Sequence, residues 1–290
     1  MTTTSQPYHI ALDGGTIATT RHAPAQVSNT TSALWLLLHG FGEDRTTLDG
    51  SAATLSAKGD IAYTIDLPFH GETVWHTDFF TPTDLLTAFA HLETRESEDM
   101  ATANKPILHL IGFSFGGHII LSLLPRIATA HRIGQVLLAA PGGTPPIFAT
   151  LLYAPPTWAK RVVTSGLRLL RPLVWGIVMI CHQLRLTRPI THQILEPILG
   201  TPHPDPRQMQ QLLGTWYSLS YFSMHWREAR RTLHTHPNIT LSFIFGKRDR
   251  VLWRGAAEWL IQHFPTQPVV WVEGGHRAAR LAIETWVRGG

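Results

Sequence analysis

The stretch that most constrains the fold of this chain spans residues 110–117 and reads LIGFSFGG. It follows a short branched apolar segment typical of a buried strand and precedes residues 118–127, where apolar side chains recur at helical spacing. Ser114 is therefore predicted on a sharp strand-to-helix turn, where a Cβ at Gly112 or Gly116 would collide with neighbouring main chain. The helix would direct its N–H groups and positive dipole end at the serine, where they would stabilise an oxyanion. The order of strand, turn and helix favours this interpretation over an inert serine in an ordinary tight turn.

Apolar and amphipathic segments alternate along most of the chain. The first two apolar segments flank Asp13-Gly14-Gly15 and predict a β-hairpin, which would form an antiparallel edge. The later apolar segments alternate with helical patterns, which is typical of parallel strands with helices on both faces of the sheet. We therefore predict an α/β fold with a mostly parallel, eight-stranded sheet. The expected strands are residues 8–12, 16–20, 33–38, 61–65, 106–111, 135–140, 239–245 and 269–272.

The pattern changes between residues 144 and 236, which contain no convincing strand and several helical segments separated by prolines. Asp205-Pro206 supplies a helix N-cap followed by proline at the first helical position. We predict a helical cap, or lid, at residues 144–236, inserted after the sixth strand. Residues 1–143 and 237–290 would form the core domain.

Composition narrows the classes of partner and compartment. Hydrophobic residues make up 44% of the chain, enough for a packed core, and the net charge of +4 comes without a basic run interleaved with aromatics. Nucleic acid is therefore not an expected partner. The single cysteine, Cys181, suits a reducing compartment, and the N-terminal residues lack the charged and apolar regions of a secretory signal. We expect a cytoplasmic location, and the sequence leaves the oligomeric state open.

Two later strands are followed by residues that could activate a serine. Residues 239–245 lead into Asp249, and residues 269–272 lead into His276 after two glycines. Because reactive groups collect beyond the carboxyl ends of parallel strands, these side chains are expected near Ser114. A serine hydroxyl needs a base, and the base needs a partner that fixes its tautomer, so His276 and Asp249 are the candidate base and acid.

Both assignments have alternatives. Asp249 could be a surface carboxylate that pairs with Arg248 or Arg250. However, no Asp or Glu lies between residues 99 and 196, so the other acid position, after residues 135–140, is empty. Among 17 histidines, His276 is distinguished by its place after the last strand, whereas His39 and His70 are interpreted as loop supports.

At this point the chain resembles the α/β-hydrolase superfamily over essentially its full length. The resemblance rests on HGFG at residues 39–42, DLPFHG at residues 66–71 and the serine turn. It implies the fold, a Ser-Asp-His triad, a cap over the site and oxyanion donors in the backbone N–H groups of Phe41 and Phe115. The chain departs from the family pattern at Phe69, where glycine is common, and after Asp249, where a proline is often found.

The predicted cap is basic and very apolar up to residue 196. One interpretation is a pocket for an acyl or aromatic group, with or without an anionic end, and another is a face that contacts anionic membranes. A third is that the apolar residues pack onto the core while the arginines stay solvated. The basic residues concerned are Lys160, Arg161, Arg168, Arg171, Arg185 and Arg188.

These features favour a serine hydrolase that cleaves a small, apolar carboxylic ester or thioester through an acyl-serine intermediate. A C–C bond hydrolase or lyase of the menaquinone or aromatic-degradation type is the alternative, because arginines in the cap would suit substrate carboxylates. A second alternative is a non-catalytic protein that binds a hydrophobic ligand. We expect no cofactor and no metal, since the pair His234 and His236 has no nearby third ligand. The glycines at 112, 116 and 117 lack the Lys-Ser/Thr of a phosphate loop.

Overall fold

A computed structural model describes residues 3–25, 33–99, 105–142, 155–169, 171–183, 196, 205–252 and 255–289. The strands are β1 (Thr3–Leu12), β2 (Gly15–Pro24), β3 (Ala33–Leu38), β4 (Ile61–Ile65), β5 (Val74–Trp75), β6 (Ile107–Phe113), β7 (Ile133–Ala139), β8 (Thr240–Gly246) and β9 (Val269–Val272). They form one nine-stranded sheet in the order β1-β2-β4-β3-β6-β7-β8-β9, with β5 paired to β2. Pairing is parallel from β4 to β9, and β1, β2 and β5 add the antiparallel edge.

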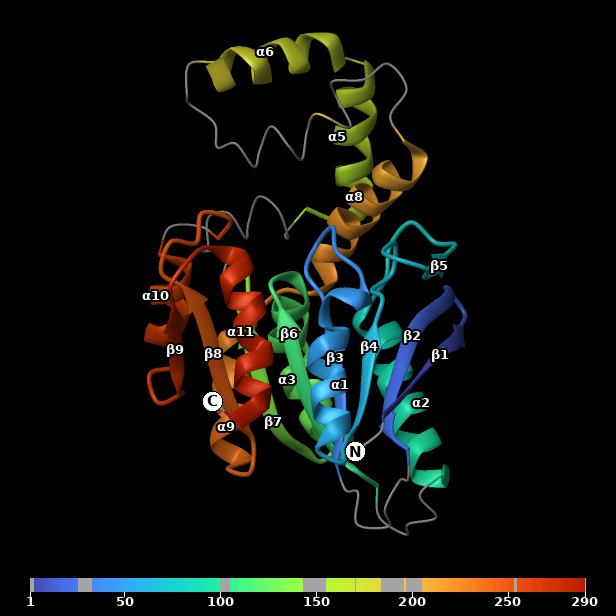
Figure 1. Cartoon of the computed structure of the whole chain (residues 1–290). Coiled ribbons are helices and arrows are strands. Elements are labelled where there is room, and N and C mark those ends of the chain that lie inside the picture. The colour runs from blue at the N-terminus through green and yellow to red at the C-terminus, as the bar shows by residue number, and fades with distance from the viewer. Residues whose placement is uncertain are drawn as a thin grey trace.

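Helices cover both faces of this sheet (Figure 1). One face packs against α1 and α11, which contribute Leu55 and Ile283 to its apolar cluster. The other face packs against α2, α3, α9 and α10, with Phe89 and Leu260 among the buried side chains. The helices that the structure describes, with two 3-10 turns, are η1 (Arg45–Leu48), α1 (Asp49–Ala57), α2 (Pro82–Asp99), α3 (Phe115–Ala130), α5 (Thr157–Leu169), α6 (Arg171–Gln183), α8 (Pro206–Ser218), η3 (Leu219–Tyr221), α9 (Trp226–Thr235), α10 (Ala256–His263) and α11 (His276–Gly289).

The predicted fold class is confirmed, and the strand count needs one correction. All eight expected strands are present, and the ninth is β5, which has two residues and is too short to leave a pattern in the sequence. Helix α2 also runs to Asp99, although the apolar helical pattern in the sequence ends at residue 92. The last turns of α2 are polar, yet Glu93 and Glu96 are buried because they pair with Lys105 and Arg21.

Helices α5, α6 and α8 lie beyond the carboxyl ends of the parallel strands, and α6 is the farthest from the sheet (Figure 1). Asp205 caps α8 as expected, accepting a hydrogen bond from the N–H of Arg207 with Pro206 at the first helical position. Helix α9, in contrast, packs against α3 on the sheet. Much of residues 143–204 lies outside the described ranges, so the boundaries of the expected cap stay a prediction.

None of the helices in the described ranges is both long enough and apolar enough to cross a membrane.

Candidate active site

Ser114 links the end of β6 to the start of α3 and has φ 51° and ψ −110°. A positive φ is rare for a residue with a side chain and costs about 1–3 kcal/mol. The Ser114 N–H is fixed by a hydrogen bond of 2.9 Å to the carbonyl oxygen of Ala139. The serine side chain is partly exposed and forms no capping hydrogen bond with α3. The Ser114 hydroxyl therefore lies on a strained turn and does not stabilise the helix through a capping hydrogen bond.

The glycines beside Ser114 permit this turn through close backbone contacts. A Cβ on Gly116 would lie 2.3 Å from the carbonyl oxygen of Leu38, and a Cβ on Gly112 would lie 2.6 Å from Gly117 Cα. Neither backbone neighbour can move aside as the end of a side chain could.

We expect Gly116→Ala to lower the free energy of unfolding by about 3 kcal/mol, because the added methyl overlaps the main chain of β3. Chemical denaturation measures this change. The matched control is Gly50→Ala in α1, whose Cβ would meet only Glu284 at 3.7 Å and which should stabilise the protein by about 0.5 kcal/mol. Equal stability of the two variants would contradict the close approach at the serine turn.

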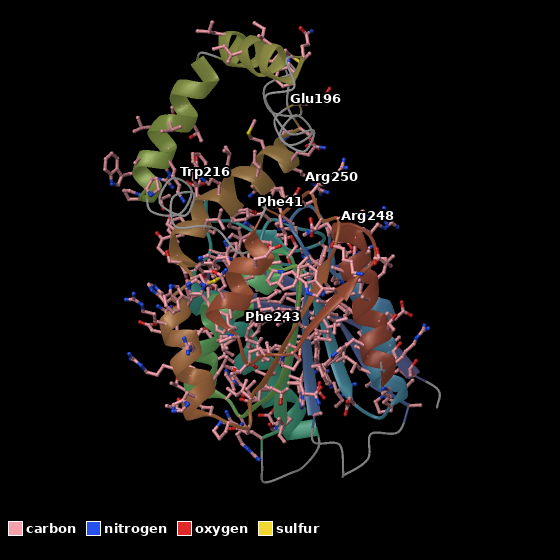
Figure 2. All side chains as sticks on the ribbon, turned by 90° about the vertical axis from the view of Figure 1, so that its left-hand side faces the viewer. Phe41, Glu196, Trp216, Phe243, Arg248 and Arg250 are labelled. Carbon is pink, nitrogen blue, oxygen red and sulfur yellow. The ribbon has the colours of Figure 1, made fainter. Side chains whose placement is uncertain are left out.

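The loop after β3 lies directly against the serine. A Cβ on Gly40 would lie 3.3 Å from the Ser114 Cβ, and the Gly116 N–H donates to the His39 carbonyl at 3.1 Å. Within the described part of the chain, the N–H groups of Phe41 and Phe115 have no hydrogen-bond acceptor. Phe41 lies at the edge of the core that faces α5 and α8 (Figure 2). The loop that carries Phe41 therefore lies beside Ser114 and beside the start of α3, which carries Phe115.

His39 fastens this loop to the segment after β4. Its Nδ1 donates to the Gly40 carbonyl at 2.7 Å, and its Nε2 accepts from the Leu67 N–H at 3.1 Å. Both ring nitrogens are occupied and the side chain is buried, so His39 is a loop support. Burial lowers its pKa to about 4, which keeps the ring neutral.

Asp66 and Arg45 make a second connection between the same loops. The Asp66 carboxylate accepts from the Arg45 N–H at 2.6 Å, from the Arg45 guanidinium and from the Glu72 N–H at 2.8 Å. The guanidinium also donates to Glu72 at 2.6 Å. Gly71 is required here, because its Cβ would lie 2.2 Å from the carboxylate carbon of Asp66. The sequence analysis missed Arg45, since nothing in its neighbourhood marks it as a partner of a residue 21 positions away.

Phe69 stands where the family pattern commonly has glycine, and its backbone conformation explains that preference. Phe69 has φ 69°, a left-handed conformation that glycine adopts without strain. Its ring packs against Phe80 and against Gly214 of α8, where an added Cβ would lie 2.5 Å away. Packing of the phenyl ring offsets the backbone strain and joins the loop to α8.

The structure brings Asp249 and His276 together from the loops after β8 and β9. His276 Nδ1 and Asp249 Oδ2 are 2.7 Å apart, and the Asp249 side chain is only 7% exposed. Asp249 makes no ion pair with Arg248 or Arg250 among the described residues, and both arginines are exposed. Figure 2 shows both arginines at the surface. Among the described residues, Asp249 therefore pairs with His276 and not with these arginines, so the alternative of a surface ion pair is wrong there.

Backbone hydrogen bonds hold the two loops in register. The Arg248 N–H donates to the Gly274 carbonyl at 2.8 Å, and the N–H groups of Val251 and Leu252 donate to Asp249 Oδ1 at 2.8 and 3.1 Å. Burial raises the pKa of Asp249, but the hydrogen bond and charge of His276 and these N–H groups outweigh it and hold the pKa below its usual value. An ionised carboxylate only accepts, so His276 carries a proton on Nδ1, and in the neutral ring this leaves the lone pair on Nε2.

His276 also contacts the strand that carries the serine. Its ring lies 4.8 Å from the Phe113 ring, centroid to centroid, and Phe113 directly precedes Ser114. The described contacts include no hydrogen bond between the Ser114 hydroxyl and the His276 ring. Such bonds are often long in free enzymes and tighten when substrate binds.

The sequence analysis did not single out His118, which lies one helical turn after Ser114. Its two ring nitrogens face the carbonyl oxygens of Gly142 and Phe222, each at 2.9 Å. Burial lowers the pKa of His118, and a neutral ring can donate to only one of these carbonyls at a time. Nothing local distinguished His118 among 17 histidines, because its partners are distant in sequence.

Buried neutral histidines make stability depend on pH. Burial lowers the pKa values of His39 and His70 to about 4, against about 6.5 in an unfolded chain. Between these values the unfolded chain binds more protons, so stability falls as the pH falls. We expect unfolding free energy to drop by about 2 kcal/mol for each histidine between about pH 7 and pH 5.

Urea denaturation across that range measures this loss. The control is His9→Gln, which removes an exposed histidine and should leave the slope unchanged. A flat stability profile down to about pH 5 would show that the two rings are already protonated or exposed in the folded protein.

The described residues contain no group of three His, Cys, Asp or Glu side chains placed to hold a metal ion.

A model of the alpha/beta hydrolase family matches residues 35–284. No curated protein sequence matches the chain. Among solved structures, a thermophilic esterase from Thermogutta terrifontis is similar with a TM-score of 0.61 at 17% identity, covering 98% of each chain.

Two further structures have comparable likeness. The thioesterase domain from the curacin biosynthetic pathway gives a TM-score of 0.56 at 12% identity and covers 98% of this chain and 99% of that one. Carboxylesterase CesB (YbfK) from Bacillus subtilis gives 0.52 at 14% identity and covers 98% and 89%. At these identities the likeness shows the fold alone.

The sheet order and the strained serine turn define a hydrolase-type α/β scaffold. With the family match over residues 35–284, the chain belongs to the α/β-hydrolase family and is a hydrolase.

Proposed function

We propose that the protein is a serine hydrolase that cleaves carboxylic esters or thioesters through an acyl-serine intermediate on Ser114. The observation that carries this proposal is the hydrogen bond of 2.7 Å between His276 Nδ1 and Asp249 Oδ2. It leaves the His276 Nε2 lone pair available as a base. The strained turn that presents the Ser114 hydroxyl supports the assignment of the nucleophile.

In the first half of the proposed reaction, His276 Nε2 takes the Ser114 proton while Oγ bonds to the carbonyl carbon of the substrate. The tetrahedral intermediate then collapses, and the alcohol or thiol leaves with the proton from His276. In the second half, His276 takes a proton from water, and the hydroxide attacks the acyl carbon. The bond to Ser114 Oγ breaks, and the serine regains its proton as the carboxylic acid is released.

The negative charge of the tetrahedral oxygen needs donors that are already in place. We propose the N–H groups of Phe41 and Phe115, which lie in the two segments that meet at Ser114. The Phe115 N–H is also at the positive end of α3, so the helix dipole adds to its effect. One such donor is typically worth about 10²–10³ in kcat.

The substrate class is the less specific part of the proposal. The esterase, carboxylesterase and thioesterase named among similar structures favour acyl transfer. We propose that the cap expected within residues 144–236 selects an apolar acyl group, with α9 excluded from it because that helix packs against α3 on the sheet. A cytoplasmic location belongs to the same proposal, because the single cysteine suits a reducing compartment.

The cap arginines that favoured C–C bond cleavage receive no added support. Arg161 pairs with Asp78, and the side chains of Arg168, Arg171, Arg185 and Arg188 lie outside the described ones. The C–C alternative therefore stays a prediction from the sequence.

Turnover of p-nitrophenyl esters with short and long acyl chains, together with an acyl thioester, tests the proposed reaction. We expect the wild-type protein to hydrolyse at least one substrate far above the rate of the Ser114→Ala variant. If no member of the panel is turned over above that background, the proposed ester or thioester activity is wrong. The relative rates then define the acyl chain that the protein prefers.

A further inference from the structure

Helices α5 and α6 expose large apolar side chains in ordered stripes. On α5, Trp158 is 70% exposed and Val162 is 66% exposed. On α6, the exposed fractions are 62% for Leu173, 53% for Ile177 and 57% for Ile180. The two residues on α5 are four positions apart, and the three on α6 are separated by four and then three positions. These spacings place each set along one side of its own helix. We call these five residues the α5–α6 apolar surface.

This surface does not contribute to the core of the protein. Helices α5 and α6 stand at the end of the molecule away from the sheet (Figure 1), and all five side chains are more than half exposed. The third interpretation of this region, in which its apolar residues pack onto the core, is therefore incorrect for these five side chains. Exposed clusters of large apolar side chains usually mark an interaction site.

The charge on the two helices indicates what kind of partner would fit. Neither helix contains an acidic residue, and together they contain four basic ones. Lys160 is buried, where its ammonium group donates to Trp216 O and Ser220 Oγ, both at 2.7 Å. Arg161 pairs with Asp78, which lies outside these helices. Arg168 and Arg171 are the other two basic residues in the sequence of these helices.

An anionic lipid surface matches both properties. It offers an apolar layer for the aliphatic side chains and negative headgroups for the arginines, and tryptophan favours the boundary between the two. A second copy of the chain would bring two basic surfaces together, which is electrostatically unfavourable. An uncharged apolar partner would leave the absence of acidic residues unexplained.

We propose that the α5–α6 apolar surface docks the protein onto membranes containing anionic lipids. Exposed apolar side chains of the two helices, Trp158 and Ile177 among them, would insert among the headgroups and upper acyl chains. The proposal does not depend on the activity assigned to Ser114.

Flotation with lipid vesicles tests the proposal on the full-length protein. The vesicles contain phosphatidylcholine either alone or with phosphatidylglycerol, at low and at high salt. We expect binding to the anionic vesicles that weakens with salt, because salt screens exposed charges. Neutralising Arg168 and Arg171 with Gln should weaken binding by about fivefold for each arginine. Combining Trp158→Ser with Ile177→Ser should weaken it by at least about tenfold.

The matched control is Leu281→Ser, which removes an exposed leucine on α11, away from the α5–α6 apolar surface. It should bind vesicles as the wild-type protein does. Circular dichroism melting would confirm that each variant is folded, and the arginine variant gives a second test if the apolar one is not. Absence of binding to anionic vesicles at low salt overturns the proposal. So does equal binding by all variants, or a dimer in sedimentation without lipid that the apolar substitutions dissociate.

Discussion

Replacing Ser114 with alanine is expected to lower kcat for ester hydrolysis by about 10⁶-fold. The hydroxyl oxygen is the only protein atom in the proposed mechanism that bonds to the acyl group, and the alanine methyl cannot replace it. Folding should be unaffected, because the Ser114 side chain forms no capping bond with α3. The rate of p-nitrophenol release and the melting temperature, measured on the same preparation, separate loss of chemistry from loss of structure.

Ser122→Ala is the matched control for this substitution. Ser122 lies two turns further along α3, where its hydroxyl donates to the Ile119 carbonyl of the same helix. Its removal should change kcat by less than about twofold, since it is remote from the serine turn. If Ser114→Ala retained more than about one hundredth of the wild-type rate, the acyl-serine mechanism would be wrong.

Replacing Asp249 with asparagine is expected to lower kcat by about 10⁴-fold. An amide can donate its N–H to His276 Nδ1, which would move the ring proton to Nε2 and remove the base. The side chain is nearly the same size, and its Oδ1 can still accept from Val251 and Leu252. We therefore expect a folded protein with unchanged KM, because the substitution affects the proton transfer and not the binding of substrate.

Glu273→Gln provides the comparison for Asp249→Asn. Glu273 lies in the loop that leads to His276 and pairs with Lys247 at the surface. Exposed ion pairs of this type contribute little, so the variant should keep most of its activity. Equal losses in the two variants would show that the loops are merely sensitive to charge, and Asp249 would lose its specific role as the partner of His276.

Much of the fold could be predicted because hydrophobic periodicity reports burial. The strands β3, β4 and β6 to β8 are buried for most of their length, and this leaves continuous apolar runs in the sequence. Strand β5 and the end of α2 were missed for opposite reasons. The strand is too short to have a period, and the polar end of α2 is buried through the ion pairs of Glu93 and Glu96.

For the candidate site, the order of the strands along the chain was enough to predict that Asp249 and His276 lie close together. Each residue follows the carboxyl end of a strand, and these strands, β8 and β9, are neighbours in the sheet. The strand order was not sufficient for residues whose roles depend on distant partners. Arg45 binds Asp66 from the loop after another strand, and Lys160 is buried against carbonyl and hydroxyl oxygens of α8 and η3. Such contacts arise from tertiary packing, which leaves no local pattern.

The most direct test of the account is to label the protein with a fluorophosphonate and measure its intact mass. We expect one adduct on the wild-type protein, mapped to Ser114 by peptide analysis, and none on Ser114→Ala or His276→Ala. The Ser122→Ala variant should label as the wild type does. An adduct on another residue, or labelling that persists when His276 is removed, would contradict the claim that His276 activates Ser114.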